Sequence, residues 1–238
     1  MESSLQACNK HLSPSHDCNL HSKQIIMQKE KTIYHLIVDK SGSMSDCIEQ
    51  TISGFNEQVN KIKQLEKEFP EQELSIGLTT FNHEVHHHFF QSPPLAVRNL
   101  TTSTYRLSGT TALLDAVGMT VESIEREIQH LQNQTNTTVV IVILTDGHEN
   151  ASKSFKLSDI RNTISRLEET GKWTFSFIGA TLDAVDVATS MAIKQQNSFA
   201  FEKANMKSGV FDKLSNSMEN YMHKKRSGED LDDFFSDK

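Results

Sequence analysis

The sequence predicts a doubly wound α/β fold, in which helices cover both faces of a mostly parallel sheet. Two short runs, residues 33–38 and 138–144, are apolar and contain β-branched residues, which is typical of strands buried on both faces. Segments with helical spacing alternate with most of the predicted strands, as in sheets built from crossover connections. Both apolar runs lead into an aspartate and a loop of small polar residues. We therefore expect ligand-binding residues where these strands end.

Six segments have the composition of strands. We place them at residues 32–39, 74–81, 85–90, 138–144, 173–178 and 198–201. Asn82-His83-Glu84 is a predicted turn between the second and third segments, so these two strands form an antiparallel hairpin. The other strands connect through helices, which predicts that they run parallel.

Five segments show the spacing of amphipathic helices. We place them at residues 46–69, 111–131, 158–170, 183–192 and 208–225. In the first helix the apolar residues recur every three or four positions, which places them on one face. Pro70 ends this helix, and Gly171 is the C-cap of the third.

The two ends of the chain lie outside this pattern. Residues 1–30 show neither a helical nor a strand period, and we expect a disordered extension, with Met27 as an alternative start of the protein. The cysteines and histidines of this extension are Cys8, His11, His16, Cys18 and His21. Their spacing matches no zinc finger, so we favour a loose tail. Residues 226–238 are mostly polar and acidic, and we expect them to be flexible.

Composition and charge limit the classes of function. The net charge of −7 disfavours a nucleic-acid-binding surface, because such surfaces need dense Lys and Arg. No run reaches about 18 consecutive apolar residues, so we expect no membrane span. The N-terminus lacks the apolar core of a secretory signal, and three cysteines do not suit a disulfide framework. We therefore expect a cytoplasmic protein that binds neither nucleic acid nor membrane.

Oxygen-bearing side chains follow the strand ends. Asp39, Ser41 and Ser43 occupy alternate positions after the first strand, and Asp146 follows the fourth. Thr111 lies at the start of the second helix. If the first and fourth strands are neighbours, these five side chains converge above the edge of the sheet. Two carboxylates and three hydroxyls suit Mg²⁺, or Mn²⁺, rather than Zn²⁺.

These residues resemble the metal-ion-dependent adhesion site of a von Willebrand factor type A domain. The three parts of its signature appear here as Asp39-x-Ser41-x-Ser43, Gly109-x-Thr111 and Thr145-Asp146-Gly147. The resemblance covers residues 31–225, and the chain is similar to stand-alone intracellular bacterial members. It implies a six-stranded sheet whose third strand is an antiparallel edge strand.

The resemblance also implies roles for the five residues. The two serines would coordinate the metal directly, the threonine in one of two conformational states, and the aspartates directly or through water. The open coordination position would take an exposed Asp or Glu of a partner protein, so the resemblance implies a protein-binding module and not an enzyme. It further implies a switch in which ligand binding draws Thr111 onto the metal and shifts the last helix.

Two other functions would use the same site. A phosphatase-like hydrolase would use the metal to activate water, but the sequence shows no obvious general base near the site, no nucleophile elbow and no phosphate-binding loop. A structural subunit would use the metal for stability alone.

A histidine cluster is the other conspicuous feature. His86 and His88 share one face of the third strand, an arrangement that also suits a transition metal. We favour the simpler interpretation, in which polar side chains on an exposed edge strand deter pairing with other chains.

Overall fold

The protein is a six-stranded sheet between two layers of helices. The computed structural model describes residues 29–130, 136–180, 183–202 and 206–235. The strands are β1 (Glu30–Asp39), β2 (Gln72–Phe81), β3 (Val85–Ser92), β4 (Thr137–Thr145), β5 (Trp173–Gly179) and β6 (Ser198–Ala200). Their order across the sheet is β3-β2-β1-β4-β5-β6, and β2 and β3 pair antiparallel while the other neighbours pair in parallel. This order confirms the predicted doubly wound α/β fold with an antiparallel edge strand.

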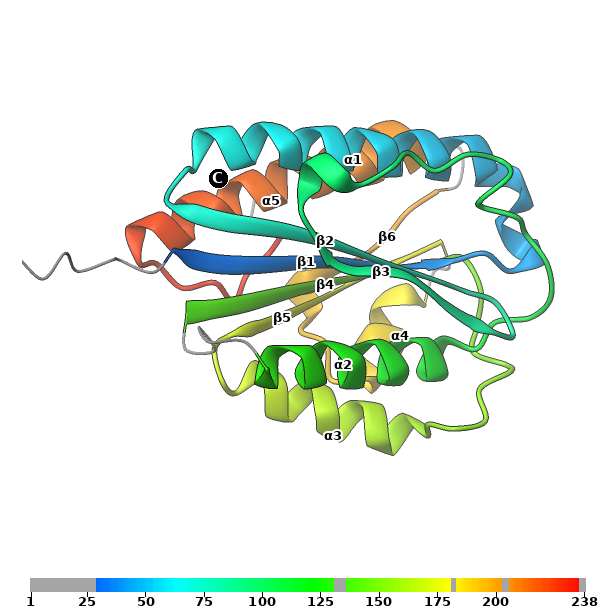
Figure 1. Cartoon of the computed structure of the whole chain (residues 1–238). Helices are drawn as coiled ribbons and strands as arrows, with labels where there is room; N and C mark the ends of the chain where they lie inside the picture. The colour runs from blue at the N-terminus through cyan, green and yellow to red at the C-terminus, as the bar shows by residue number, and fades with distance from the viewer. Residues whose placement is uncertain (1–28, 131–135, 181–182, 203–205, 236–238) are drawn as a thin grey trace, which may run out of the picture.

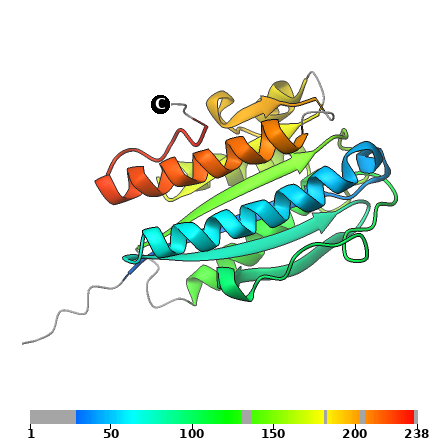
Figure 2. The same ribbon diagram turned by 90° about the horizontal axis from the view of Figure 1, so that it is seen from above.

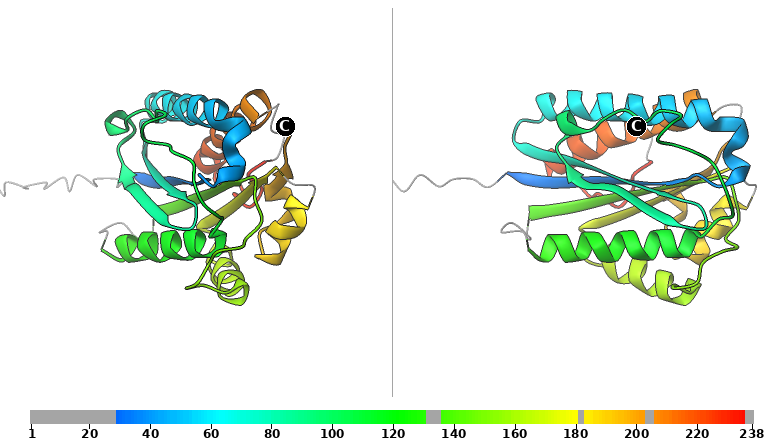
Figure 3. Two further views of the ribbon diagram at one scale, coloured as in Figure 1. Left: turned by 90° about the vertical axis from the view of Figure 1, so that its right-hand side faces the viewer. Right: turned by 45° about the vertical axis from the view of Figure 1, so that its right-hand side comes forward.

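The α-helices divide between the two faces of the sheet (Figure 1). They are α1 (Ile48–Glu68), α2 (Leu113–Gln129), α3 (Leu157–Glu168), α4 (Ala184–Ser190) and α5 (Asp212–Ser227). α1 and α5 lie side by side on one face, as the view from above shows (Figure 2). α2, α3 and α4 cover the other face (Figure 3). A π-helical turn, Met206–Phe211, leads directly into α5.

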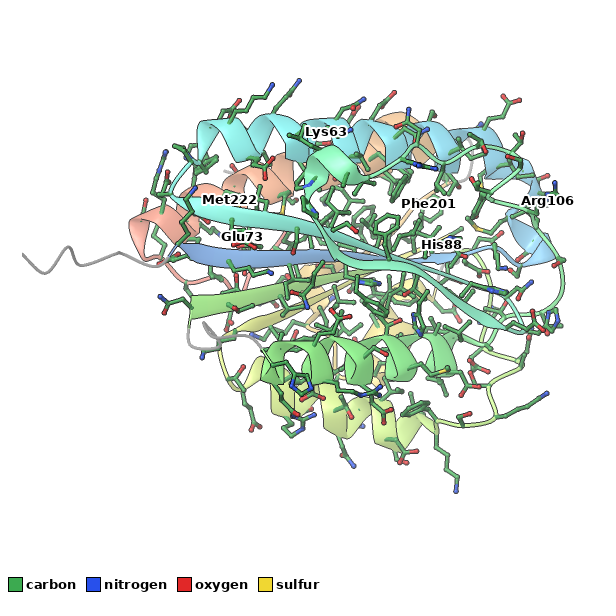
Figure 4. All side chains as sticks on the ribbon, viewed as in Figure 1. Lys63, Glu73, His88, Arg106, Phe201 and Met222 are labelled. Atoms are coloured by element: carbon green, nitrogen blue, oxygen red, sulfur yellow. The ribbon has the colours of Figure 1, made fainter. Side chains whose placement is uncertain are left out.

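Alternation along the central strands builds a core on each face of the sheet. In β1, the side chains of Tyr34, Leu36 and Val38 join the core beneath α1 and α5, whereas Ile33 and Ile37 join the core beneath α2 and α3. Successive side chains of a strand point to opposite faces, so a sheet covered on both sides requires an unbroken apolar run. The side chains fill the space between the sheet and both helix layers (Figure 4).

Two helices begin later than the sequence predicts. α1 begins at Ile48, because residues 42–47 form a 3₁₀-helical turn ahead of it. α2 begins at Leu113, so Thr111 lies in the preceding loop and not in the helix. There the backbone N–H of Thr111 donates a hydrogen bond to Asn150 Oδ1 at 2.9 Å. A side chain of the β4–α3 loop therefore satisfies a donor that the helix does not use.

Within residues 226–238, which the sequence predicted to be a flexible tail, the stretch that ends at Phe235 packs on the core. Phe234 is 1% exposed and Phe235 is 6% exposed. Asn197 holds the segment at two points, because its Nδ2 donates to the main-chain oxygen of Asp232 (2.9 Å) and its Oδ1 accepts the N–H of Phe234 (2.8 Å). The acidic composition suggested exposure, but burying two aromatic rings outweighs it. Residues 236–238 lie outside the described part.

The predicted N-terminal extension lies almost wholly outside the described residues. Met27 and the cysteines and histidines before it fall within residues 1–28, so the expectations about them stay predictions. The strand β1 begins at Glu30, one residue before the predicted domain boundary. None of the helices in the described ranges is long and apolar enough to cross a membrane.

Candidate metal centre

The two strands that carry the aspartates are neighbours in the sheet. β1 and β4 pair in parallel, with Val38 beside Leu144. Asp39 and Asp146 therefore lie at the same edge of the sheet, which faces the viewer in the left panel of Figure 3. Asp39 is fully buried and Asp146 is 7% exposed. The condition for the predicted convergence is met.

Hydrogen bonds hold both carboxylate oxygens of Asp39. The backbone N–H of Ser41 donates to Oδ1 at 2.7 Å, and the hydroxyl of Thr145 donates to Oδ2 at 2.6 Å. The buried hydroxyl of Tyr105 donates to the main-chain oxygen of Asp39. Neither contact is evident from the sequence, although Thr145 belongs to the signature. Asp39 is thus positioned by hydrogen bonds from three segments of the chain before any ligand binds.

The charge of Asp39 depends on this environment. Burial raises the pKa of Asp39 to about 6, while the hydrogen bonds from Thr145 and Ser41 oppose the rise and the nearby Asp146 adds to it. An opposite charge close to a carboxyl group favours its ionised form. A cation at this place would therefore offset the cost of burying the carboxylate.

The two serines connect the loop after β1 to the loop after β4. Ser41 Oγ and Ser43 Oγ lie 3.0 Å apart, and Ser43 Oγ donates a hydrogen bond of 2.7 Å to Asp146 Oδ1. Ser41 is almost fully buried. Hydroxyl and carboxylate oxygens from two separate segments are therefore adjacent at the edge of the sheet.

Thr111 reaches the same place from a third segment. A Cβ atom on Gly147 would lie 2.9 Å from Thr111 Oγ1, 3.4 Å from Ser43 Oγ and 3.8 Å from Asp39 Oδ2. The absent side chain of Gly147 therefore leaves a space bordered by oxygens of the segment after β1 and of the loop before α2. The structure brings all five predicted residues together.

The donor atoms fit a hard divalent cation. The five side chains provide two carboxylates and three hydroxyls, and Mg²⁺ prefers oxygen ligands and readily keeps waters in its remaining positions. Within the ranges that the structure describes, no three His, Cys, Asp or Glu side chains gather as they would in a zinc centre. The chemistry of the site therefore rests on hydroxyls as much as on carboxylates.

Comparison with known proteins identifies the family. The sequence model of the von Willebrand factor type A domain matches residues 35–217, which include all five site residues. The chain belongs to this family. Von Willebrand factor type A domains often bind a divalent metal at a metal-ion-dependent adhesion site, and they generally mediate interactions between proteins. A sequence search among curated proteins gives no significant match.

Solved structures share the fold at low sequence identity. The von Willebrand domain of the type V pili tip protein Mfa5 from Porphyromonas gingivalis has a TM-score of 0.57 and 12% identity, covering 82% of this chain and 97% of that one. Proximal thread matrix protein 1 from the mussel byssus has a TM-score of 0.51 and 16% identity, covering 78% of this chain. A von Willebrand factor type A protein from Catenulispora acidiphila has a TM-score of 0.53 and 11% identity, covering 79% of this chain. The matches span 45% of the mussel protein and 42% of the Catenulispora protein, and at these identities they show the fold alone.

In this von Willebrand domain, hydrogen bonds from two neighbouring segments hold the loop that carries Thr111. Asn82, in the turn after β2, accepts the N–H of Ala112 on its main-chain oxygen (2.7 Å) and donates from Nδ2 to the main-chain oxygen of Ser108 (2.8 Å). The N–H of Gly42 donates to the main-chain oxygen of Gly109 at 3.2 Å. Gly109 has φ of 72°, a conformation that favours glycine. The first two parts of the signature are therefore joined through their glycines.

Two carboxylates outside the predicted set hold the β4–α3 loop against α2. Glu149 accepts hydrogen bonds from the backbone N–H of Leu114 and from the backbone and hydroxyl of Ser152. Asp115 accepts the backbone N–H groups of residues 153–155 at 2.8–2.9 Å. In the sequence, the sole indication of the role of Asp115 is that acidic residues favour the first turn of a helix, and no such signal marks Glu149.

The histidines of β3 lie on the edge strand of the sheet. His86 and His88 are exposed, His88 Nε2 lies 2.8 Å from Thr80 Oγ1, and His86 Nε2 lies 3.3 Å from Glu84 Oε2. These contacts join each histidine to a neighbour on or beside the hairpin. They fit the interpretation of β3 as a polar edge strand.

Proposed function

We propose that this von Willebrand domain is a Mg²⁺-dependent protein-binding module. Asp39, Ser41, Ser43, Thr111 and Asp146 hold the ion, and an exposed Asp or Glu of a partner protein completes its coordination. The observation that carries this proposal is the convergence of hydroxyl and carboxylate oxygens around the space at Gly147. Mn²⁺ fits the same donors.

The donor set explains why the partner group is a carboxylate. A bound divalent cation is the largest local charge in such a site. Hydroxyl ligands are neutral, so they leave more positive charge on the ion than carboxylates would. An anionic oxygen from outside is therefore attracted to an open coordination position.

The alternative function is a hydrolase that uses a metal ion bound at the same site. Such an enzyme needs a base that takes a proton from the attacking water. Glu149, the first carboxylate after the site in the β4–α3 loop, accepts hydrogen bonds from Leu114, Ala151 and Ser152 and thereby caps α2. This engagement supports binding over hydrolysis. Turnover of p-nitrophenyl phosphate with Mg²⁺ or Mn²⁺ that Asp39→Ala abolished would contradict the proposal.

Metal binding is tested by isothermal titration calorimetry with Mg²⁺ and Mn²⁺. We expect the wild-type domain to bind both ions and Ser43→Ala to bind them at least about tenfold more weakly. Ser45→Ala is the matched control, because Ser45 is exposed in the same turn and its hydroxyl lies 3.5 Å from Asp46 Oδ1. An equal loss in both variants would show that the assignment of the donors is wrong.

Partner binding is tested by capture from a lysate of the source organism. The wild-type domain and the variant Asp39→Ala/Ser41→Ala are each used with Mg²⁺ and with a chelator. We expect a protein retained by the wild-type domain with Mg²⁺ and lost in the other three conditions. Retention of the same proteins in all four conditions would contradict metal-bridged binding. A metal that raises the melting temperature without any captured partner would instead favour a structural role.

A further inference from the structure

An apolar pocket opens directly beside the metal centre. Its volume is about 260 Å³, and its apolar walls are formed by Leu113, Leu114, Leu157, Val187 and Met191. These residues come from the N-termini of α2 and α3 and from the region of α4, which lie together on one face of the sheet (Figure 1). The pocket is large enough for one side chain of the size of leucine, methionine or phenylalanine.

Two residues that line the pocket lie close in sequence to residues of the metal centre. Leu113 lies two residues after Thr111, and His148, which also lines the pocket, lies two residues after Asp146. The loops that supply two of the five metal-binding side chains therefore supply part of the pocket wall. A partner segment that places a carboxylate at the metal and extends toward α4 would meet this pocket.

Two of the polar side chains in the pocket wall, Glu149 and Ser190, are engaged within the protein. The carboxylate of Glu149 accepts hydrogen bonds from the backbone N–H groups of Leu114, Ala151 and Ser152. The hydroxyl of Ser190 donates to the main-chain oxygen of Val187 at 2.7 Å. These groups are thus directed toward the protein, and the pocket offers its apolar surface to a ligand.

The mouth of the pocket carries an exposed apolar side chain. Leu157, the first residue of α3, is 43% exposed, whereas Leu113 and Met191 are each 1% exposed. A single exposed leucine on a surface needs no explanation. Here it borders a pocket with a buried apolar floor, and a ligand side chain would remove Leu157 and the floor from water together.

We propose that this pocket receives an apolar side chain of the protein that binds at the metal. The partner is then recognised by two features at a fixed spacing, a carboxylate for the metal and a leucine, methionine or phenylalanine for the pocket. This inference rests on the proposed function of the metal centre and adds the specificity that a single carboxylate lacks. Leu157 and Ser190 are specificity-determining residues in this arrangement.

The test uses the full chain and a displayed peptide library with a fixed glutamate flanked by randomised residues. In Mg²⁺ we expect the selected peptides to share an apolar residue at one spacing from the glutamate. A selected peptide and its counterpart with alanine at that position are then compared. Burying one such side chain predicts that the alanine peptide binds the wild-type domain about tenfold more weakly or worse.

Two variants isolate the pocket from the metal. Leu157→Asp places a charge at the mouth, and Ser190→Met fills the pocket from its wall. Both should weaken the apolar peptide about tenfold and leave the alanine peptide unchanged. Leu95→Asp is the control, because Leu95 is 74% exposed in a separate loop and lines no wall of this pocket.

The outcomes separate this inference from the function on which it rests. Peptides that bind only in Mg²⁺ but share no apolar residue at any one spacing from the glutamate would overturn the pocket and leave the metal-dependent binding intact. Equal effects of Leu157→Asp on both peptides would also overturn the pocket. Binding that is the same in Mg²⁺ and in a chelator, or that survives Asp39→Ala, would overturn the proposed function and this inference with it.

Discussion

The hydroxyl of Thr145 at the end of β4 donates a hydrogen bond of 2.6 Å to Oδ2 of Asp39 at the end of β1. The bond joins the two central strands at the edge where the metal centre lies. Asp39 is fully buried, so its carboxylate depends on partners within the protein and on any bound cation. Thr145 therefore positions an oxygen of the proposed centre without belonging to the donors we assign.

Replacing Thr145 should lower the stability of the domain. Thr145→Val keeps the shape of the side chain but removes the donor, which leaves a buried carboxylate with one hydrogen bond fewer. We expect the free energy of unfolding in urea to fall by about 1–3 kcal/mol. Thr189→Val is the control, because Thr189 is exposed on α4 and should change stability by less than about 0.5 kcal/mol. Equal losses in the two variants would contradict this role.

The space at Gly147 should be essential for metal binding. Gly147→Ala would place a methyl group 2.9 Å from Thr111 Oγ1 and 3.4 Å from Ser43 Oγ, within the place assigned to the ion. We expect calorimetry to show no Mg²⁺ binding, while circular dichroism shows a folded domain. Gly42→Ala is the matched control, because its Cβ would meet nothing nearer than the main-chain oxygen of Gly109 at 3.7 Å. A Gly147→Ala variant that bound Mg²⁺ normally would place the ion elsewhere.

His35 should make the domain less stable in mild acid. This side chain is fully buried in β1, and burial lowers its pKa to about 3 from 6.5, with a further lowering by His87. The unfolded chain therefore binds one more proton than the folded chain between these two values. The stabilisation is fully present above about pH 6.5 and decreases as the pH falls, by about 2 kcal/mol between pH 7 and pH 5.

Urea unfolding at pH 7 and pH 5 measures the contribution of His35. His35→Leu cannot take up a proton, so its stability should fall by about 2 kcal/mol less than that of the wild-type domain over this interval. Both proteins contain the other histidines, so the contribution of those histidines cancels when the two stability changes are subtracted. An identical loss in the two proteins would show that His35 does not titrate as its burial predicts.

The C-terminal segment should contribute to the stability of the whole domain. Phe234 is 1% exposed, and its ring lies 5.1 Å from that of Phe235 and 6.1 Å from that of Tyr221. We expect Phe234→Ala to lower the free energy of unfolding by about 3–5 kcal/mol, as for other buried aromatic residues. Leu95→Ala, at an exposed position, should have little effect. A Phe234→Ala variant as stable as the wild-type domain would restore the expectation of a flexible tail.

Local pattern was sufficient to predict the fold and the convergence of five oxygen-bearing side chains at one edge of the sheet. Unbroken apolar runs indicate strands buried on both faces, and parallel strands end at a common edge of the sheet. Asp39 and Asp146 follow two such runs, so their convergence requires no more than the adjacency of β1 and β4. The types and order of the residues were therefore enough to predict that Asp39 and Asp146 lie together.

The supporting contacts depend on tertiary packing. Gly77 lies opposite His35 in the sheet, where a Cβ atom would approach His35 Nδ1 to 2.0 Å, and no local pattern relates these two residues. Likewise, the tail appeared exposed because its composition is acidic, yet Asn197 and the adjacent core provide partners for Phe234.

The sequence by itself thus determined the fold class, the signature residues and the oxygen chemistry of the candidate centre. The tertiary structure decided which side chains position that centre, where the tail packs and that an apolar pocket opens beside it. The physical reason is that periodicity and strand ends are properties of neighbouring residues. Hydrogen bonds such as Thr145 to Asp39, across 106 positions of the chain, form only when the packed sheet brings their atoms together.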